Sequence, residues 1–314
     1  MNIHHPGSGR LIIVSNRLPF TVHFGNSELQ FDESAGGLVT GLSAFLDSYK
    51  DHFPKQEEHV WVGWPGNTIP DEFKDRVRAK ALADYHAYPV FLSEADMDHF
   101  YLGFCNKTIW PLFHYFPSYA VYQEEYWQNY RHVNELFREA LLELIQPDDT
   151  VWVQDYHLML LPRLLRERLP DVLVGFFLHI PFPSFEIFRL LPPRWRTEIL
   201  EGLLGADLVG FHTYEYMQHF LQSAMRILGH EHTTKPLLRG RGDDDGRGRR
   251  FFDAEPVSGP QSQCHVPFAR RVKRTRARHD RLRIAYQFGF DRLCQPVKSL
   301  HQRRSLLRRD SRFS

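Results

Sequence analysis

The sequence predicts an α/β fold in which a parallel β-sheet is covered by helices on both faces. Short, continuously apolar runs, such as residues 11–14 and 172–178, have the composition of strands buried on both sides. Segments with helical periodicity separate these runs, and alternation of strands with helices is typical of parallel sheets. The alternation stops near Thr234, so we divide the chain into residues 1–234 and residues 235–314.

The expected elements follow from local apolar patterns. Strands are expected at residues 11–14, 59–64, 88–92, 151–153, 172–178 and 207–211. Helices are expected from Leu38, from Ser93 to about Cys105, at residues 158–169 and from Tyr214 to Gly229. Ser93 and Asp96 have the spacing of a capping box, and Gly229 stands where a C-terminal helix cap belongs.

The two segments also differ in charge. Residues 1–234 contain 18 Lys and Arg against 30 Asp and Glu, whereas residues 235–314 contain 21 against 8. The second segment includes a Gly/Asp/Arg tract at 239–250 and a basic run at 270–283, and we expect a basic tail of low order. Two alternatives stay open. One is a helical segment around residues 281–307; the other is a polyanion-binding arm, although aromatic residues for base stacking are not interleaved with the basic run.

The composition of the whole chain argues against several classes of protein. The formal net charge of +1 gives no reason to expect a specific nucleic-acid or membrane partner. Cys105, Cys264 and Cys294 are too few and too scattered for a disulfide framework or a zinc site. Only four apolar residues follow the polar N-terminus, too few for a secretory signal, and no apolar stretch is long enough for a membrane span, so we expect a cytoplasmic protein.

Polar residues follow several of the predicted strands, at the edge where open parallel sheets bind ligands. The first strand is followed by residues 15–17, the strand at 151–153 by residues 154–157, and the strand at 172–178 by His179. Asp155, His157 and His179 could bind sugar hydroxyls or relay protons. Each also has an ordinary structural interpretation. Asp155 could cap the next helix, and the two histidines could be packing residues with satisfied hydrogen bonds.

Three further features leave two interpretations each. Gly36 and Gly37 precede a predicted helix, where paired glycines could admit a phosphate or simply form a tight turn. The aromatic blocks 110–115 and 127–130 could stack on sugar rings or belong to the core. Arg17 could bind a phosphate or pair with an acid at the sheet edge, such as Asp155. No phosphate-binding G-x-x-x-x-G-K-[ST] and no metal-binding H-E-x-x-H occurs.

Six motifs in this order and spacing resemble those of the trehalose-6-phosphate synthases, retaining glycosyltransferases with the two-domain, Rossmann-like GT-B fold. They are Val14-Ser15-Asn16-Arg17, Ser34-Ala35-Gly36-Gly37-Leu38, Trp61-Val62-Gly63-Trp64, Trp110-Pro111-Leu112-Phe113-His114-Tyr115, Asp155-Tyr156-His157-Leu158 and Phe176-Phe177-Leu178-His179-Ile180-Pro181-Phe182-Pro183. The resemblance covers about residues 10–230. It implies that residues 1–234 are the N-terminal, acceptor-binding domain of such a fold.

The resemblance implies transfer of glucose from UDP-glucose to glucose 6-phosphate, giving α,α-trehalose 6-phosphate and UDP without a metal or other cofactor. On the acceptor side, matching motifs imply that Arg17 and Tyr101 bind the phosphate of glucose 6-phosphate. They also imply that Trp110 and Asp155 position the acceptor sugar.

On the donor side, the resemblance implies that Gly36 and Gly37 present backbone amides to the diphosphate of UDP-glucose. His179 would lie beside the transferred glucose, and His179 and Asp155 are the expected catalytic residues. Gln154 stands where many relatives have a histidine, just outside these contacts.

The resemblance does not extend into residues 235–314. In this family the second domain supplies most of the UDP-glucose site through an Arg-Leu-Asp-Tyr-x-Lys-Gly motif, of which residues 291–294 share only a fragment. A truncation, retained intron or frame break near Thr234 would explain this difference. We therefore expect the chain to be inactive alone. The alternative function is a non-catalytic binding or regulatory subunit that partners full-length synthase or trehalose-phosphatase subunits.

Overall fold

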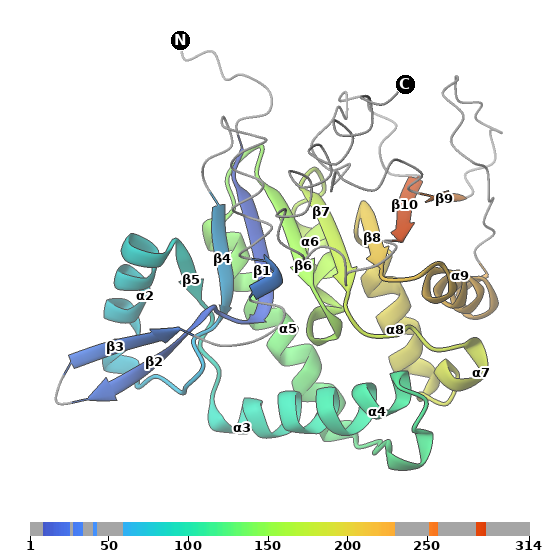
Figure 1. The fold of residues 1–314 in the computed structure, drawn as a ribbon, viewed down its shortest axis with the longest axis horizontal. Helices are drawn as coiled ribbons and strands as arrows, with labels where there is room; N and C mark the ends of the chain where they lie inside the picture. Colours follow the sequence, from blue (N-terminus) through green and yellow to red (C-terminus); the bar gives the residue numbers. More distant parts are fainter. Residues whose placement is uncertain are drawn as a thin grey trace, which may run out of the picture.

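The computed structural model describes residues 9–25, 28–33, 40–42, 59–229, 251–256 and 281–286. Its centre is a parallel sheet with the strand order β5-β4-β1-β6-β7-β8-β10-β9 (Figure 1). Six of these strands come from the first segment: β1 (Leu11–Arg17), β4 (His59–Trp64), β5 (Ala87–Pro89), β6 (Thr150–Gln154), β7 (Leu173–Leu178) and β8 (Leu208–Phe211). The predicted parallel sheet is confirmed.

The second segment contributes two strands to one edge of the sheet. β10 (Arg281–Tyr286) pairs in parallel with β8, and β9 (Phe251–Pro256) pairs in parallel with β10. The expected basic tail of low order and the polyanion-binding arm stay predictions. The other alternative, a helix around residues 281–307, is wrong for residues 281–286, which form β10. Leu282, Ile284 and Tyr286 alternate with polar or small residues, which is the period of a strand and not of a helix. The other residues of 235–314 lie outside the described part of the chain.

From β4 onward, one or more helices separate successive strands of the first segment. The helices are α2 (Asp71–Tyr85), α3 (Glu94–Asp96), the π-helix η1 (Met97–Ile109), α4 (Trp110–Phe113), α5 (Glu124–Leu144), α6 (Leu161–Arg168), α7 (Phe185–Phe188), α8 (Pro193–Leu203) and α9 (Tyr214–Leu228). Short 3₁₀ turns occur at η2 (Pro117–Tyr119) and η3 (Tyr156–Leu158), and β2 (Phe20–Gly25) and β3 (Glu28–Glu33) form an antiparallel hairpin. No helix in the described ranges is long and apolar enough to cross a membrane.

The predicted helix ends have the expected caps. Ser93 and Asp96 form a reciprocal capping box, and the helix they begin runs on through η1 and α4 instead of ending near Cys105. Gly229 closes α9 with a φ of 72° and donates its N–H to Met225. Of the helix expected from Leu38, the structure describes residues 40–42, which are helical.

β1 separates two apolar cores, because successive side chains of a strand point to opposite faces. Ile12 and Val14 belong to the larger core, which η1 and helices α5 to α9 cover. Ile13, between them in sequence, belongs to the smaller core formed with the β2–β3 hairpin and α2. All three side chains are fully buried, so both faces of the sheet are covered, as the continuous apolar run predicts.

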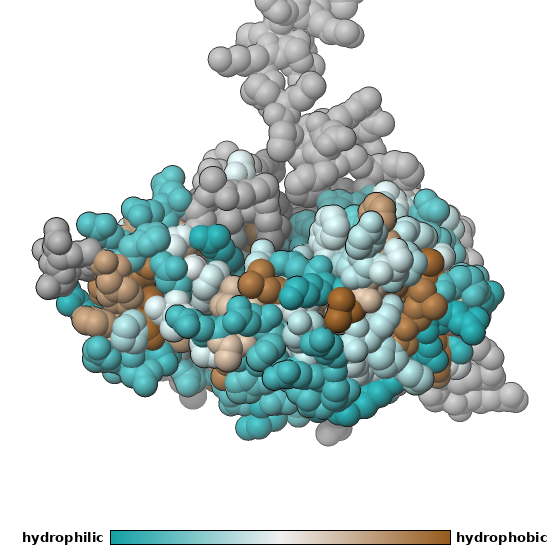
Figure 2. Space-filling model, turned by 90° about the horizontal axis from the view of Figure 1, so that it is seen from below, coloured by the Kyte–Doolittle hydropathy of each residue, from teal (hydrophilic) through white to brown (hydrophobic). Residues whose placement is uncertain are grey.

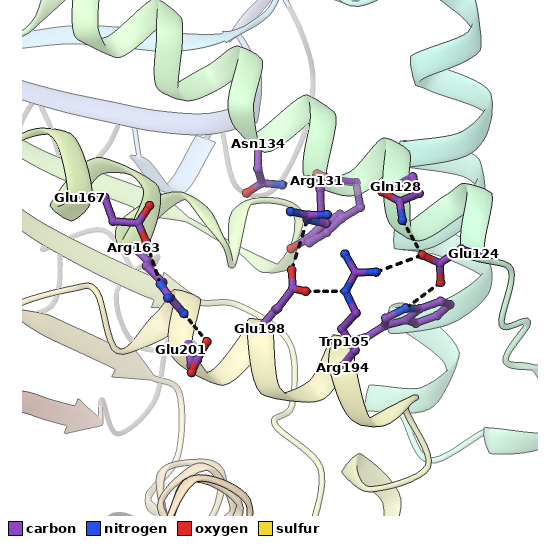
Figure 3. Close-up of polar contacts among 11 residues, drawn as sticks. Glu124, Gln128, Arg131, Asn134, Arg163, Glu167, Arg194, Trp195, Glu198 and Glu201 are labelled. Carbon is purple, nitrogen blue, oxygen red and sulfur yellow. Dashed lines mark hydrogen bonds and ion pairs between the residues drawn. The ribbon is translucent and has the colours of Figure 1, made fainter.

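An ion network joins α5 to α8 on the outside of the larger core (Figure 3). Glu198 of α8 lies 3.2 Å from Arg131 Nε of α5 and 2.8 Å from Arg194 Nε of its own helix. Beside this network Trp195, which is 3% exposed, stacks on Trp127 with ring centroids 5.5 Å apart. The aromatic pair holds the two helices more firmly than the half-exposed ions do, since exposed ion pairs contribute about 0–1 kcal/mol.

Candidate functional site at the carboxyl edge of the sheet

Five neighbouring strands end at the carboxyl edge of the sheet, and each end carries an aromatic or ionisable side chain. In the spatial order β4, β1, β6, β7 and β8, these residues are Trp64, Arg17, Asp155, His179 and His212. In Figure 1 this edge faces downward, and the long helix from α3 to α4 runs beneath it. The structure therefore brings Arg17, Asp155 and His179 to one edge, as the sequence predicts.

Asp155 has a backbone conformation that is almost restricted to glycine. Its φ of 70° and ψ of 171° carry a strain of about 1–3 kcal/mol. The Asp155 N–H donates to Phe177 O at 2.7 Å, and Leu158 N–H donates to Asp155 O at 3.2 Å. The Asp155 Oδ1 accepts from His179 N–H at 3.1 Å, so the carboxylate bridges two strand ends instead of capping the following helix. Strain of this kind is concentrated at functional sites.

The Asp155 carboxyl is buried in the protein, which shifts its ionisation. Burial raises its pKa to about 7, although backbone N–H groups of Tyr156 and His179 act in the opposite direction. A carboxyl group with a pKa near neutrality can both accept and donate a proton under physiological conditions. Asp155 is therefore suited to hydrogen-bond a hydroxyl group and to exchange a proton with it.

His179 is a neutral imidazole held in one orientation. Its Nε2 lies 2.9 Å from the side-chain oxygen of Gln154, and its ring contacts those of Phe177 and His212 at centroid distances of 4.7 and 5.5 Å. Burial, followed by the charge of His212, lowers the pKa of His179 to about 3. Burial lowers the pKa of His212 as well. The histidine pair is uncharged at neutral pH.

His157 packs between two tyrosines. Its ring is stacked on Tyr101 at 5.8 Å with an interplanar angle of 13°, and it contacts Tyr156 at 4.0 Å. Both imidazole nitrogens are buried and have no hydrogen-bond partner in the described chain. Burial, followed by the charge of His179, lowers the pKa of His157 to about 3. His157 is thus a packing residue. The ordinary interpretation also expected its hydrogen bonds to be satisfied, and in the described chain they are not.

Arg17 lies exposed beside Trp64 at the ends of β1 and β4. Its Nη2 donates to Thr21 Oγ1 at 2.5 Å, and its guanidinium carbon lies 5.9 Å from the centroid of the Trp64 ring. The ion pair with Asp155 that the sequence left open is not formed, and no other described carboxylate pairs with Arg17. A guanidinium without an acidic partner can receive an anion through two parallel hydrogen bonds.

The aromatic blocks divide between surface and core. Trp110, at the junction of η1 and α4, is 45% exposed and stacks on His114 at 4.2 Å. Trp127 and Tyr130 of α5 are fully buried. The core interpretation is therefore confirmed for Trp127 and Tyr130, whereas stacking of the exposed Trp110 on a sugar ring stays a prediction.

Two buried side chains of α5 support the turn that carries Asp155. The Tyr130 hydroxyl donates to Tyr156 O at 2.8 Å and accepts from Met159 N–H at 3.0 Å. The Asn134 amide donates to His157 O at 3.2 Å. Because these bonds fix the backbone after Asp155, they help to maintain its strained conformation.

Buried polar atoms without a partner are concentrated at this edge. Of the eleven such side-chain atoms among the described residues, five belong to Asn16, Trp64, Gln154 and His157. Native proteins satisfy the great majority of their buried polar atoms, and an unsatisfied one costs about 1–3 kcal/mol. A polar ligand or bound water molecules can complete the hydrogen bonds of these atoms.

No role was expected for Trp64 or His212, although both lie at the site. Their positions at the ends of predicted strands were the signal that could have identified them. Gly36 and Gly37, expected on the donor side, lie outside the described residues.

The surface around the site is mixed in character. Figure 2 views the molecule from the side of the carboxyl edge and shows separate apolar patches on a largely hydrophilic surface. Trp110, Tyr115, Phe116 and Tyr119 are exposed in the segment from α4 to η2. Exposed aromatic faces next to polar groups are suited to stacking on sugar rings.

The glycosyltransferase family 20 profile matches residues 9–245. The chain belongs to glycosyltransferase family 20. The bifunctional trehalose-6-phosphate synthase/phosphatase of Thermoproteus tenax is 49% identical over 223 residues, covering 71% of this chain and 30% of the relative. The alpha,alpha-trehalose-phosphate synthase of Schizosaccharomyces pombe is 47% identical over 226 residues, covering 70% and 42%.

A solved relative confirms the fold assignment for the first segment. The trehalose-6-phosphate synthase OtsA is 33% identical, with a TM-score of 0.57 over 74% of this chain and 46% of that chain. The six strands of the first segment therefore belong to the N-terminal, Rossmann-like half of a GT-B fold. The chain spans less than half the length of each of these three family members.

Proposed function

We propose that residues 1–234 bind glucose 6-phosphate at the carboxyl edge of the sheet, as the acceptor half of a trehalose-6-phosphate synthase. The observation that carries the proposal is the grouping of Arg17, the near-neutral carboxyl of Asp155 and the buried unsatisfied atoms at one edge. A hexose phosphate offers an anion and several hydroxyl groups to such a set. A structure of the Burkholderia xenovorans relative, which is 30% identical, is in complex with glucose-6-phosphate.

In the proposed complex the phosphate lies between Arg17 and Tyr101. The Arg17 guanidinium forms two parallel hydrogen bonds with phosphate oxygens, a geometry that lysine cannot reproduce. The Tyr101 hydroxyl and the unsatisfied Trp64 Nε1 supply further donors. Together they give the site its preference for the phosphorylated sugar.

The hexose ring lies between Trp110 and Asp155. The exposed face of Trp110 stacks on the ring, and the Asp155 carboxylate accepts from a sugar hydroxyl. Burial of the Asp155 carboxyl and the strain of its backbone both destabilise the fold. A contact with the sugar therefore explains the position of Asp155 better than a contribution to the stability of the fold does.

In the proposed reaction, glucose passes from UDP-glucose to the acceptor and UDP leaves. The backbone amides of Gly36 and Gly37 hold the donor diphosphate, and neutral His179 hydrogen-bonds the transferred glucose. We propose that no metal is used, so that backbone amides and cationic side chains stabilise the charge on the leaving diphosphate.

Titration of the chain with glucose 6-phosphate and with glucose tests acceptor binding. Hydrogen bonds to charged groups contribute about 1.5–3 kcal/mol, so Arg17→Ala should weaken binding of the phosphorylated sugar about tenfold or more. Arg76→Ala is the matched control, because Arg76 is exposed on α2, away from the edge. A folded Arg17→Ala variant that prefers glucose 6-phosphate as strongly as the wild type contradicts the phosphate role.

We further propose that these 314 residues bind the acceptor without transferring glucose. They contain no Arg-Leu-Asp-Tyr-x-Lys-Gly motif. Two cationic groups at about 3 kcal/mol each correspond to about four powers of ten in rate. UDP release measured beside a full-length relative should be negligible, and turnover close to that of the relative contradicts the proposal. Co-purification with a full-length synthase favours the alternative of a non-catalytic subunit.

A further inference from the structure

We propose that Gln154 is the positioning residue of His179, and that its side-chain oxygen fixes the imidazole in the tautomer with the proton on Nε2. The relevance of this tautomer to glucose transfer rests on the proposed function, whereas the assignment of the tautomer does not.

The sheet places the two side chains together. Gln154 is the last residue of β6 and is completely buried. β6 pairs in parallel with β7, with Gln154 opposite Phe177, so the side chain can reach His179 two residues further along. The Gln154 Oε1 lies 2.9 Å from His179 Nε2. Because this contact joins neighbouring strands of one sheet, it fixes a single nitrogen of the ring at a defined place.

The chemistry of the amide oxygen then decides the tautomer. An amide oxygen only accepts hydrogen bonds, so His179 Nε2 must donate, and a neutral imidazole has one N–H. Burial keeps the ring neutral by lowering the pKa of His179 to about 3. Phe177 and His212 contact the ring at 4.7 and 5.5 Å and restrict its rotation. With the amide oxygen on this side, the tautomer we infer has its proton on Nε2, which leaves Nδ1 as the basic nitrogen.

The opposite orientation of the amide predicts the other tautomer. It would place the Gln154 nitrogen on the imidazole and move the His179 proton to Nδ1. In the orientation observed, the Gln154 Nε2 is buried and has no partner in the described chain. Its two donors belong to the same group of unsatisfied atoms that an oxygen-rich ligand would complete. The observed orientation therefore serves both His179 and a polar ligand.

Long-range ¹H–¹⁵N spectra of the ¹⁵N-histidine-labelled chain distinguish protonated from unprotonated ring nitrogens. The chain has 18 histidines, and His179→Gln identifies the resonances that belong to His179. We expect the chemical shift of a protonated nitrogen at Nε2 and that of an unprotonated nitrogen at Nδ1. A proton on Nδ1 in the wild type overturns the inference without the need for any variant.

Two variants test the part played by Gln154. Gln154→Glu keeps an acceptor opposite Nε2, so the same tautomer is expected. Gln154→Met removes the acceptor, so the two ¹⁵N shifts of His179 should move toward each other as the proton redistributes. Unchanged shifts in Gln154→Met overturn the inference. The resonances of His219, which contacts Phe182 O from α9, report whether each variant keeps its fold. No ligand is added, so the result is independent of glucose 6-phosphate binding.

Discussion

Replacing Asp155 with asparagine should stabilise the fold at alkaline pH and have little effect at acidic pH. The carboxyl has a pKa of about 7 in the folded chain, against an ordinary value of 3.8. Below pH 3.8 the carboxyl is protonated in both the folded and the unfolded chain, so it does not make the free energy of unfolding depend on pH. As the pH rises toward 7, the unfolded chain loses this proton more readily, so the folded state becomes less stable.

The size of the effect follows from the shift. About three pKa units at 1.36 kcal/mol each give a penalty of about 4 kcal/mol above pH 7. The asparagine side chain does not titrate, so Asp155→Asn escapes this penalty. The asparagine keeps a side-chain oxygen that can accept a hydrogen bond from the His179 N–H. Its amide hydrogens can change the free energy of unfolding, but by the same amount at every pH. The histidines titrate in both proteins, and their contribution cancels in the difference.

Urea unfolding followed by tryptophan fluorescence at pH 4 and pH 8 measures this difference. The stability of Asp155→Asn relative to the wild type should rise by about 4 kcal/mol between the two pH values. Asp75→Asn, at a fully exposed carboxylate of α2, is the control and should show little change. A difference between Asp155→Asn and the wild type that stays constant from pH 4 to pH 8 refutes the reasoning, because the carboxyl would then have an ordinary pKa.

Two further variants compare the loss of a buried hydrogen-bonding hydroxyl with the loss of charge in an exposed ion network. Tyr130→Phe removes the hydroxyl that bonds Tyr156 O and Met159 N–H, so chemical denaturation should show a loss of about 1–3 kcal/mol; a loss below 0.5 kcal/mol contradicts the support of the Asp155 turn. Glu198→Gln weakens the ion network between α5 and α8, and the same measurement should show a loss of at most about 1 kcal/mol, smaller still at high salt. A loss above 2 kcal/mol in Glu198→Gln would mean that the ions and not the aromatic pair join the helices.

The sheet could be predicted from sequence because its strands are buried on both faces. Residues 172–178 form a continuous apolar run, and β7 occupies residues 173–178. Helix α2 was missed since only Val77 and Ala81 are buried in its 15 residues, which leaves almost no apolar stripe. Helix α5 was interpreted only as an aromatic block. Its buried residues recur at helical spacing from Trp127 to Leu141, and that signal could have predicted it.

The sequence could predict where the candidate site lies, but not the backbone conformations and side-chain contacts within it. Strand ends identified Arg17, Asp155 and His179, because the carboxyl ends of parallel strands meet at one edge. The strained backbone of Asp155 and the contact between Gln154 and His179 depend on the register of β6 against β7. Register is a long-range property, and no local pattern of residues contains it.

A crystal structure of the chain with glucose 6-phosphate tests the central claim most directly. The account predicts that the phosphate lies against the Arg17 guanidinium and that the hexose lies between Trp110 and Asp155, at the carboxyl edge of the sheet. A sugar phosphate bound at another surface, or bound at this edge with its phosphate away from Arg17, would contradict the account.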